Sequence, residues 1–268
     1  PDPGEPILYG HEWVLWQRQI LFVKGPDYIV IRDDLEDAKN RVPTEWALQV
    51  LADEVKTGPG RASFTGQLGM DLDVVFAEPP SADLQTGKWG HEGEEQPDWY
   101  TDFPLSGMGE TQISLHARAP SSGDYLAALY PYPHDEEPPA MDAIQPGLLR
   151  ITRGGTEDLV FFSNRWGAAE TEGVRFSGRV GLIRRESGKR TVWLLDGDGA
   201  EFDDFYFTCQ GPLSLEIGKS SLRGESKGPA RTLSGKWGEY PGIPVVTVDG
   251  ERIECDSTPD GYFFFTIP

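Results

Sequence analysis

Apolar and polar residues alternate in short runs along most of this chain, and turn-forming residues separate the runs. In the segment 113–118, ISLHAR, every second residue is apolar, which puts the apolar and polar sets on opposite faces of a strand. The segments 62–66 and 72–76 alternate in the same way. Such short runs, rich in Val, Ile, Phe and Tyr, predict strands rather than helices.

Two pairs of runs predict β-hairpins. The apolar stretches 20–23 and 28–31 flank the tight break Gly25-Pro26-Asp27, and the stretches 176–184 and 190–196 flank the turn sequence ESGK. The run Trp46–Val55 fits either a short helix or a strand. Further strands are predicted over 125–132, 148–152, 158–162, 202–209, 213–217, 244–248 and 262–267.

These elements predict an all-β fold, an antiparallel multi-stranded β-sandwich of layered sheets with little helix. Residues 1–15, which begin PDPGEP, are expected to form a linker-like N-terminal segment. Residues 16–268 are expected to form a single large antiparallel β-sandwich domain. Two long breaks, 79–104 and 134–146, interrupt the strands, and no repeat of fixed period is present.

The charge balance excludes some partners. With 24 Lys and Arg against 44 Asp and Glu, the net charge is -20, which repels the phosphates of nucleic acid. It also disfavours an acidic glycan, unless basic residues cluster in one cleft. No apolar run approaches the ~20 residues that a membrane-spanning helix needs, so neither nucleic acid nor a membrane is an expected partner.

One acidic segment is a candidate metal site. The sequence DGDGAEFDD contains Asp196, Asp198, Asp203 and Asp204, and spaced carboxylates in a Gly-bearing loop suit calcium, which binds oxygen ligands at flexible geometry. The segment departs from the EF-hand pattern because Ala200 stands where a third ligand belongs. The alternative is a turn between strands whose acidic residues only improve solubility.

The long break after residue 79 is a candidate glycan-binding loop. It contains Trp89, His91, Trp99 and Tyr100, and exposed aromatic rings can stack on the faces of sugars. Loops longer than ~12–15 residues are often functional. The alternative is that these rings cover one end of the sandwich.

Other candidate chemistry is sparse. His116 lies on the polar face of its strand and is expected to be solvated, whereas His91 and His134 lie in acidic segments that would be solvated or would bind a metal. Cys209 lies in an apolar strand and predicts a buried thiol; with Cys255 it permits one disulfide but does not require it. The sequence has no phosphate-binding loop, dinucleotide fingerprint or G-x-S-x-G motif.

The first predicted hairpin resembles a motif of a known family. The pattern W-x-R-x-I-L-F-x-K, followed after a short break by Y-x-V-I-R-D, is similar to the β-rich C-terminal half of heparinase II/III-like polysaccharide lyases. The matching residues are Trp16, Arg18, Ile20, Leu21, Phe22, Lys24, Tyr28, Val30, Ile31, Arg32 and Asp33. The segment 62–73, and the segment 174–181 together with 194–197, also resemble this part of the family.

The resemblance implies a supporting role rather than catalysis. In that family the lyase residues lie on an upstream α/α toroid and include an H-x-H-x-D element, which this chain lacks; His11 is the sole histidine before Trp16. No catalytic residue is therefore carried over. The resemblance implies a non-catalytic β domain that packs against such a toroid, forms one wall of a polysaccharide cleft, and is extracellular or periplasmic.

Two other functions stay open. The first is a stand-alone carbohydrate-binding module that uses the Trp89–Tyr100 loop. The second is a β-sandwich carbohydrate-active enzyme that uses two of the many carboxylates, although the sequence singles out no pair.

Overall fold

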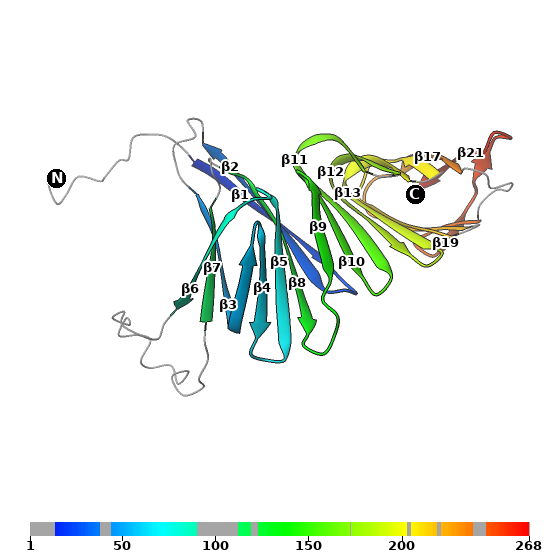
Figure 1. The fold of residues 1–268 in the computed structure, drawn as a ribbon. Coiled ribbons are helices and arrows are strands. Elements are labelled where there is room, and N and C mark those ends of the chain that lie inside the picture. The colour runs from blue at the N-terminus through cyan, green and yellow to red at the C-terminus, as the bar shows by residue number, and fades with distance from the viewer. Residues whose placement is uncertain are drawn as a thin grey trace, which may run out of the picture. The chain divides into compact units, whose positions relative to one another are not determined.

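The protein is built from strands and turns. The computed structural model describes residues 14–37, 44–89, 112–118, 123–171, 173–202, 205–218, 221–237 and 245–267, and within these ranges it contains no helix, including none long and apolar enough to cross a membrane. The expected all-β class with layered antiparallel sheets is confirmed (Figure 1). The chain gathers into two compact units, residues 1–137 and residues 138–268, and the expected single domain stays a prediction.

Unit 1 is one eight-stranded antiparallel sheet with the strand order β1-β2-β8-β5-β4-β3-β7-β6. Its strands are β1 Val14–Val23, β2 Tyr28–Asp37, β3 Glu45–Gly58, β4 Arg61–Gly66, β5 Met70–Glu78, β6 Asp83–Trp89, β7 Gln112–Arg118 and β8 Tyr125–Pro133. The expected first hairpin is confirmed, because Val23 of β1 pairs with Tyr28 of β2. β1 begins at Val14, so the expected linker overlaps this strand by two residues.

The 14-residue strand β3 changes partner along its length. Its first half pairs with β7, and its second half, after an irregularity between Ala52 and Glu54, pairs with β4 (Figure 1). Trp46 and Leu115 from the first part of the sheet thereby share a core with Phe64 and Phe76 from the second part. The rings of Trp46 and Phe76 meet edge to face, with centroids 5.2 Å apart. Packing thus settles the ambiguity at Trp46–Val55 in favour of a strand.

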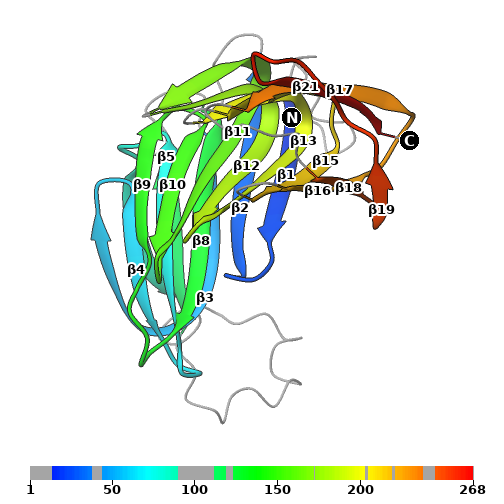
Figure 2. The same ribbon diagram turned by 90° about the vertical axis from the view of Figure 1, so that its right-hand side faces the viewer.

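Unit 2 is a 13-stranded sheet. Its strands are β9 Ala140–Gln145, β10 Leu148–Arg153, β11 Thr156–Thr171, β12 Val174–Glu186, β13 Lys189–Phe202, β14 Phe205–Thr208, β15 Leu213–Ile217, β16 Ser221–Ser226, β17 Arg231–Trp237, β18 Val245–Val248, β19 Glu251–Ile253, β20 Asp256–Ser257 and β21 Tyr262–Ile267. Every pair is antiparallel except β16 with β18. Figure 2 shows β17 and β21 on one side of this unit and β15, β16 and β18 on the other.

The strand β13 also has 14 residues and changes partner along its length. Residues 190–194 pair with β15, whereas residues 199–202 pair with β14. The sheet therefore divides at β13 into a main layer and a smaller layer made by β14, β17, β20 and β21. Side chains from both layers, such as Leu215 and Phe263, bury themselves in one aromatic-rich core.

Glycines permit the bend at β12 and β13. The register between these strands shifts three times from Ser177 to Gly181. The ring of Phe176 stacks on Phe161 at a centroid distance of 4.7 Å, and it lies directly over Gly181 and Gly197, where any added Cβ would overlap it. Gly181 therefore marks a position where the strands pack closely on an aromatic ring.

Three sequence predictions about elements need correction. The segment 202–209 is not one strand, because Phe202 ends β13 and pairs with Phe205 of β14 across a reversal. Part of the long break after residue 79 forms the strand β6. The acidic segment that begins at Asp196 is not a loop, since residues 196–202 continue β13. In the second and third cases pairing with a neighbouring strand overrides the local turn signal.

We predict that the Gly181→Ala substitution destabilises the protein by about 1–3 kcal/mol, as overpacking of a filled core does, because the new methyl group displaces Phe176. Urea unfolding followed by tryptophan fluorescence measures the loss. The matched control is Gly167→Ala on the neighbouring β11, where an added Cβ has nothing within 4 Å. Equal stability of the two variants would contradict the proposed role of Gly181.

Candidate functional site

The family-like hairpin motif forms a structural cluster. Arg18 of β1 donates from Nε and Nη2 to the two carboxylate oxygens of Asp33 in β2, at 2.7 Å each. The indole N–H of Trp16 donates to the same carboxylate at 3.1 Å, and the guanidinium of Arg18 lies over the Trp16 ring, 5.1 Å from its centroid. The motif W-x-R therefore satisfies one buried carboxylate.

The next arginine of the motif has a different set of partners. Arg32 is 2% exposed and forms ion pairs with Asp34 at 2.7 Å, Glu78 at 3.2 Å and Asp124 at 3.6 Å. Asp33 and Asp34 thus bind different arginines, as the alternation of side chains along a strand predicts. A buried guanidinium with several carboxylates holds β2, β5 and the start of β8 together, and removing a partner from such a set is costly.

Two of the candidate histidines are engaged in ion pairs. His116 is partly exposed and not simply solvated, since its Nδ1 lies 2.5 Å from Glu45 Oε1 on the neighbouring strand β3. Glu45 also accepts from Nε of Arg118 at 2.7 Å. The hydrogen bonds from Arg118 and then His116 lower the pKa of Glu45.

His134 fastens the turn between β4 and β5. Its Nδ1 lies 2.6 Å from Asp71 Oδ1, its ring also hydrogen-bonds the backbone of Gly66, and Asp71 accepts from the Gly66 amide at 3.1 Å. The hydrogen bond to Asp71 raises the pKa of His134. These contacts give His134 a structural role directly after β8.

The predicted glycan loop falls outside the described residues for the most part. Trp89 is the last residue of β6, and His91, Trp99 and Tyr100 lie beyond the described ranges. The predicted calcium ligands divide in the same way, because Asp203 and Asp204 are not described. Asp196 accepts from Nε of Arg179 at 2.6 Å. Within the described ranges no three His, Cys, Asp or Glu side chains gather as a metal site, and both predicted sites stay predictions.

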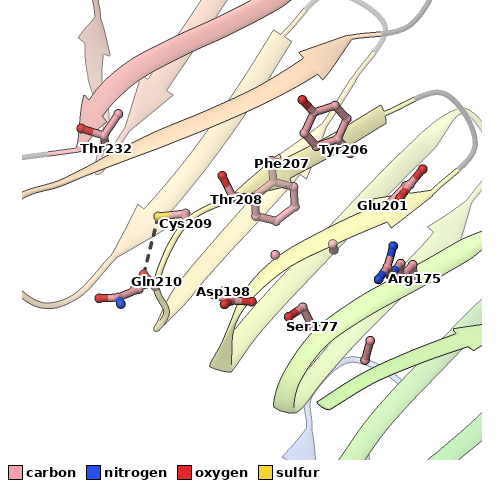
Figure 3. Close-up of a pocket in the computed structure, with 13 residues that line it drawn as sticks. Arg175, Ser177, Asp198, Glu201, Tyr206, Phe207, Thr208, Cys209, Gln210 and Thr232 are labelled. Atoms are coloured by element: carbon pink, nitrogen blue, oxygen red, sulfur yellow. Dashed lines mark hydrogen bonds between the residues drawn. The ribbon is translucent and has the colours of Figure 1, made fainter. Parts of the chain in front are cut away.

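A groove of about 510 Å³ in unit 2 is lined by residues of β11, β12, β13, β14 and β17 (Figure 3). Strand pairing explains its floor. Ala168, Ser177, Gly199 and Thr208 are register partners across β11, β12, β13 and β14, and side chains of directly paired residues share one face. All four side chains are small, so a trough forms across the strands.

A second row of paired residues borders this trough. Arg175, Glu201 and Tyr206 are successive register partners on β12, β13 and β14, and Lys236 and Tyr262 continue the row on β17 and β21. The first three residues line the groove. Figure 3 shows them together along one side and Asp198 and Gln210 toward the other.

The residues between the two rows point inward. Phe176, Ala200 and Phe207 are paired neighbours and belong to the buried core of unit 2. The strands that carry the outward rows are therefore held in place by the packing of their inward residues in the core. Gly199 has its backbone packed so closely on β14 that an added Cβ would lie 2.8 Å from the Phe207 carbonyl oxygen.

Aromatic rings and a lysine extend the bordering row. The rings of Tyr206 and Tyr262 meet edge to face with centroids 6.4 Å apart, and Lys236 Nζ lies 5.1 Å from the centroid of Tyr262. Burial raises the pKa of Tyr206, and the nearby Tyr262 and Glu201 raise it further. The phenol of Tyr206 is therefore a neutral hydroxyl throughout the physiological range.

A cysteine closes one end of the groove. Cys209 is a buried free thiol, and Cys255 is free as well. Burial raises the pKa of Cys209, although the nearby Arg231 opposes this effect. The sequence prediction of a buried, unreactive thiol agrees with this position, because a nucleophilic cysteine needs a lowered pKa.

Comparisons with models of known protein families and with curated proteins gave no match to this chain. The resemblance to heparinase II/III-like lyases therefore rests on the sequence motifs and stays a prediction.

No sequence motif predicted that the groove residues lie together. Ser177, Gly199 and Thr208 come from three strands, and their positions meet only through register. One clue was present in the sequence: in 205–208 the outward residues are Tyr206 and Thr208, whereas the alternate residues are both phenylalanine.

We predict that the His134–Asp71 pair stabilises unit 1 at low pH. Because the folded-state pKa of His134 is raised, its contribution is fully present below the unfolded pKa of ~6.5 and is lost as the pH rises through the folded value. An NMR titration of the His134 ring should give a higher pKa than that of an unfolded peptide, and Asp71→Asn should lower it. The control is Glu137→Gln, which changes an exposed residue three positions after His134. It should leave the titration of His134 unchanged.

Proposed function

We propose that this chain is a non-catalytic β domain that binds a polysaccharide and supports an associated catalytic domain. The observation that carries the proposal is the groove over β11 to β14. The resemblance to the C-terminal part of heparinase II/III-like lyases supports the same role, with an upstream α/α toroid of the same protein as the expected catalytic partner.

The dimensions of the groove suit a chain-like ligand. Its lining comes from five strands, β11 to β14 and β17. Neighbouring strands lie about 4.8 Å apart, so the lined surface extends over roughly 19 Å. A trough of this length that crosses the strands accommodates several linked units of a polymer better than a single small molecule.

The chemistry of the lining suits sugars. The negative face of the Tyr206 ring attracts the partly positive C–H groups of a pyranose, while Arg175 donates hydrogen bonds and Asp198 and Glu201 accept them. A sugar hydroxyl both donates and accepts, so a border that offers both kinds of group can bind neighbouring hydroxyls.

The positions of the histidines support a non-catalytic role. Lyase cleavage of a uronic acid needs a base near the acidic carbon and a group that neutralises the carboxylate. His116 and His134, the candidate bases that lie in the described ranges, belong to unit 1, and no histidine is among the described residues that line the groove of unit 2. We expect the isolated chain to release no unsaturated sugar from any uronic-acid polymer.

The test of binding uses Tyr206. We expect Tyr206→Ala to weaken the binding of a polysaccharide at least ~tenfold, the effect of losing about 1.4 kcal/mol, because the ring and its hydroxyl are both removed. Affinity gel electrophoresis against a panel of soluble polysaccharides selects a ligand, and isothermal titration calorimetry then measures its affinity.

Two further variants make this test specific. Phe22→Ala removes an aromatic ring that is 52% exposed on β1, outside the groove, and should bind as the wild type does. Ser177→Ile fills the trough floor with a side chain that suits a strand and should abolish binding without unfolding. The proposal fails if the folded wild type binds no polysaccharide, or if all three variants bind equally well.

A further inference from the structure

We infer that the groove selects uncharged glycan chains and rejects polymers of uronic acids. This inference rests on the proposed function and names the class of ligand. It departs from the acidic substrates that the lyase resemblance implies.

The charges that line the groove carry the inference. One cation, Arg175, and two carboxylates, Asp198 and Glu201, are among its lining residues. Arg175 lies directly opposite Glu201 on one side and Glu170 on the other. Both register neighbours of Arg175 are therefore acidic residues, and with two carboxylates to one cation among its lining residues the groove is not the basic cleft that an acidic polymer requires.

The bordering row continues with a lysine that lies against an aromatic ring. Lys236 Nζ lies over the ring of Tyr262, an arrangement in which the ring attracts the ammonium group. An acidic sugar would bring its carboxylate close to Asp198 and Glu201, and these two carboxylates outnumber the single cation Arg175 among the residues that line the groove. The net charge of -20 for the whole chain adds a repulsion that acts during approach.

The same residues suit an uncharged sugar. Arg175 offers donors to hydroxyl groups, and Asp198 and Glu201 offer acceptors. Tyr206 stays a neutral phenol because burial raises its pKa, so its ring and hydroxyl face the ligand without adding charge. The small residues of the floor, Ala168, Ser177 and Gly199, leave room for the sugar rings.

The experiment compares two sets of probes on the full chain. The uncharged set contains the hexasaccharides of cellulose, xylan and β-1,3-glucan, and the acidic set contains the hexamers of galacturonate and mannuronate. Calorimetric titrations run at low and at high salt. We expect the best uncharged probe to bind at least ~tenfold more tightly than either acidic probe, with little dependence on salt.

A charge-removing variant tests the cause. Glu201→Gln takes one carboxylate from the groove, and it should raise the ratio of acidic-probe affinity to uncharged-probe affinity several-fold. The matched control is Glu225→Gln, which removes an exposed carboxylate on β16, outside the groove, and it should leave this ratio unchanged.

The outcomes separate the two proposals. If the acidic probes bind as tightly as the uncharged ones, or if Glu201→Gln and Glu225→Gln change the ratio equally, the inference about ligand class is overturned while glycan binding by the groove stands. If no probe of either class binds the folded protein, the proposed function itself is overturned. Preferential binding of an uncharged probe, with the ratio raised by Glu201→Gln alone, supports both.

Discussion

The architecture of each unit depends on one long strand that pairs with two different sets of neighbours. In unit 1 this strand is β3, shared between β4 and β7, and in unit 2 it is β13, shared between β14 and β15. A sheet that divides in this way folds back over itself, so its inward side chains meet each other. Among the described residues, each unit thereby buries an apolar core with strands, without the helices that cover one face of a mixed sheet.

This arrangement demands small residues where the strands bend. At the bend of β12 and β13, Gly181 and Gly197 accept the ring of Phe176, and Gly178 has a φ of 147°, which favours glycine. Beyond the bend β13 pairs with β14 of the smaller layer, and both strands contribute residues to the groove. The packing of Phe176 on the inward side of these strands therefore determines where the residues of the candidate site lie on the outward side.

The sequence predicts the elements better than the site. Alternation over 113–118 and the ESGK turn are local signals, and both are confirmed as β7 and the β12–β13 hairpin. The strand predicted over 202–209 was wrong, because Phe202 ends β13 and pairs with Phe205 of β14, whereas the two residues between them in the sequence are neither glycine nor proline. The groove requires strand registers, which depend on which strands become neighbours, and a single sequence does not state them.

The alternation of inward and outward residues beneath the groove separates the residues that determine stability from those that determine the surface chemistry. Phe176, Ala200 and Phe207 determine how well the layers pack, and their neighbours Arg175, Ser177, Glu201 and Thr208 determine what the outer face presents. Substitutions at outward positions such as Arg175 and Glu201 should cost little stability, because alternate residues of a strand point away from the core. A rigid strand scaffold of this kind lets ligand preference diverge among descendants that keep the same fold.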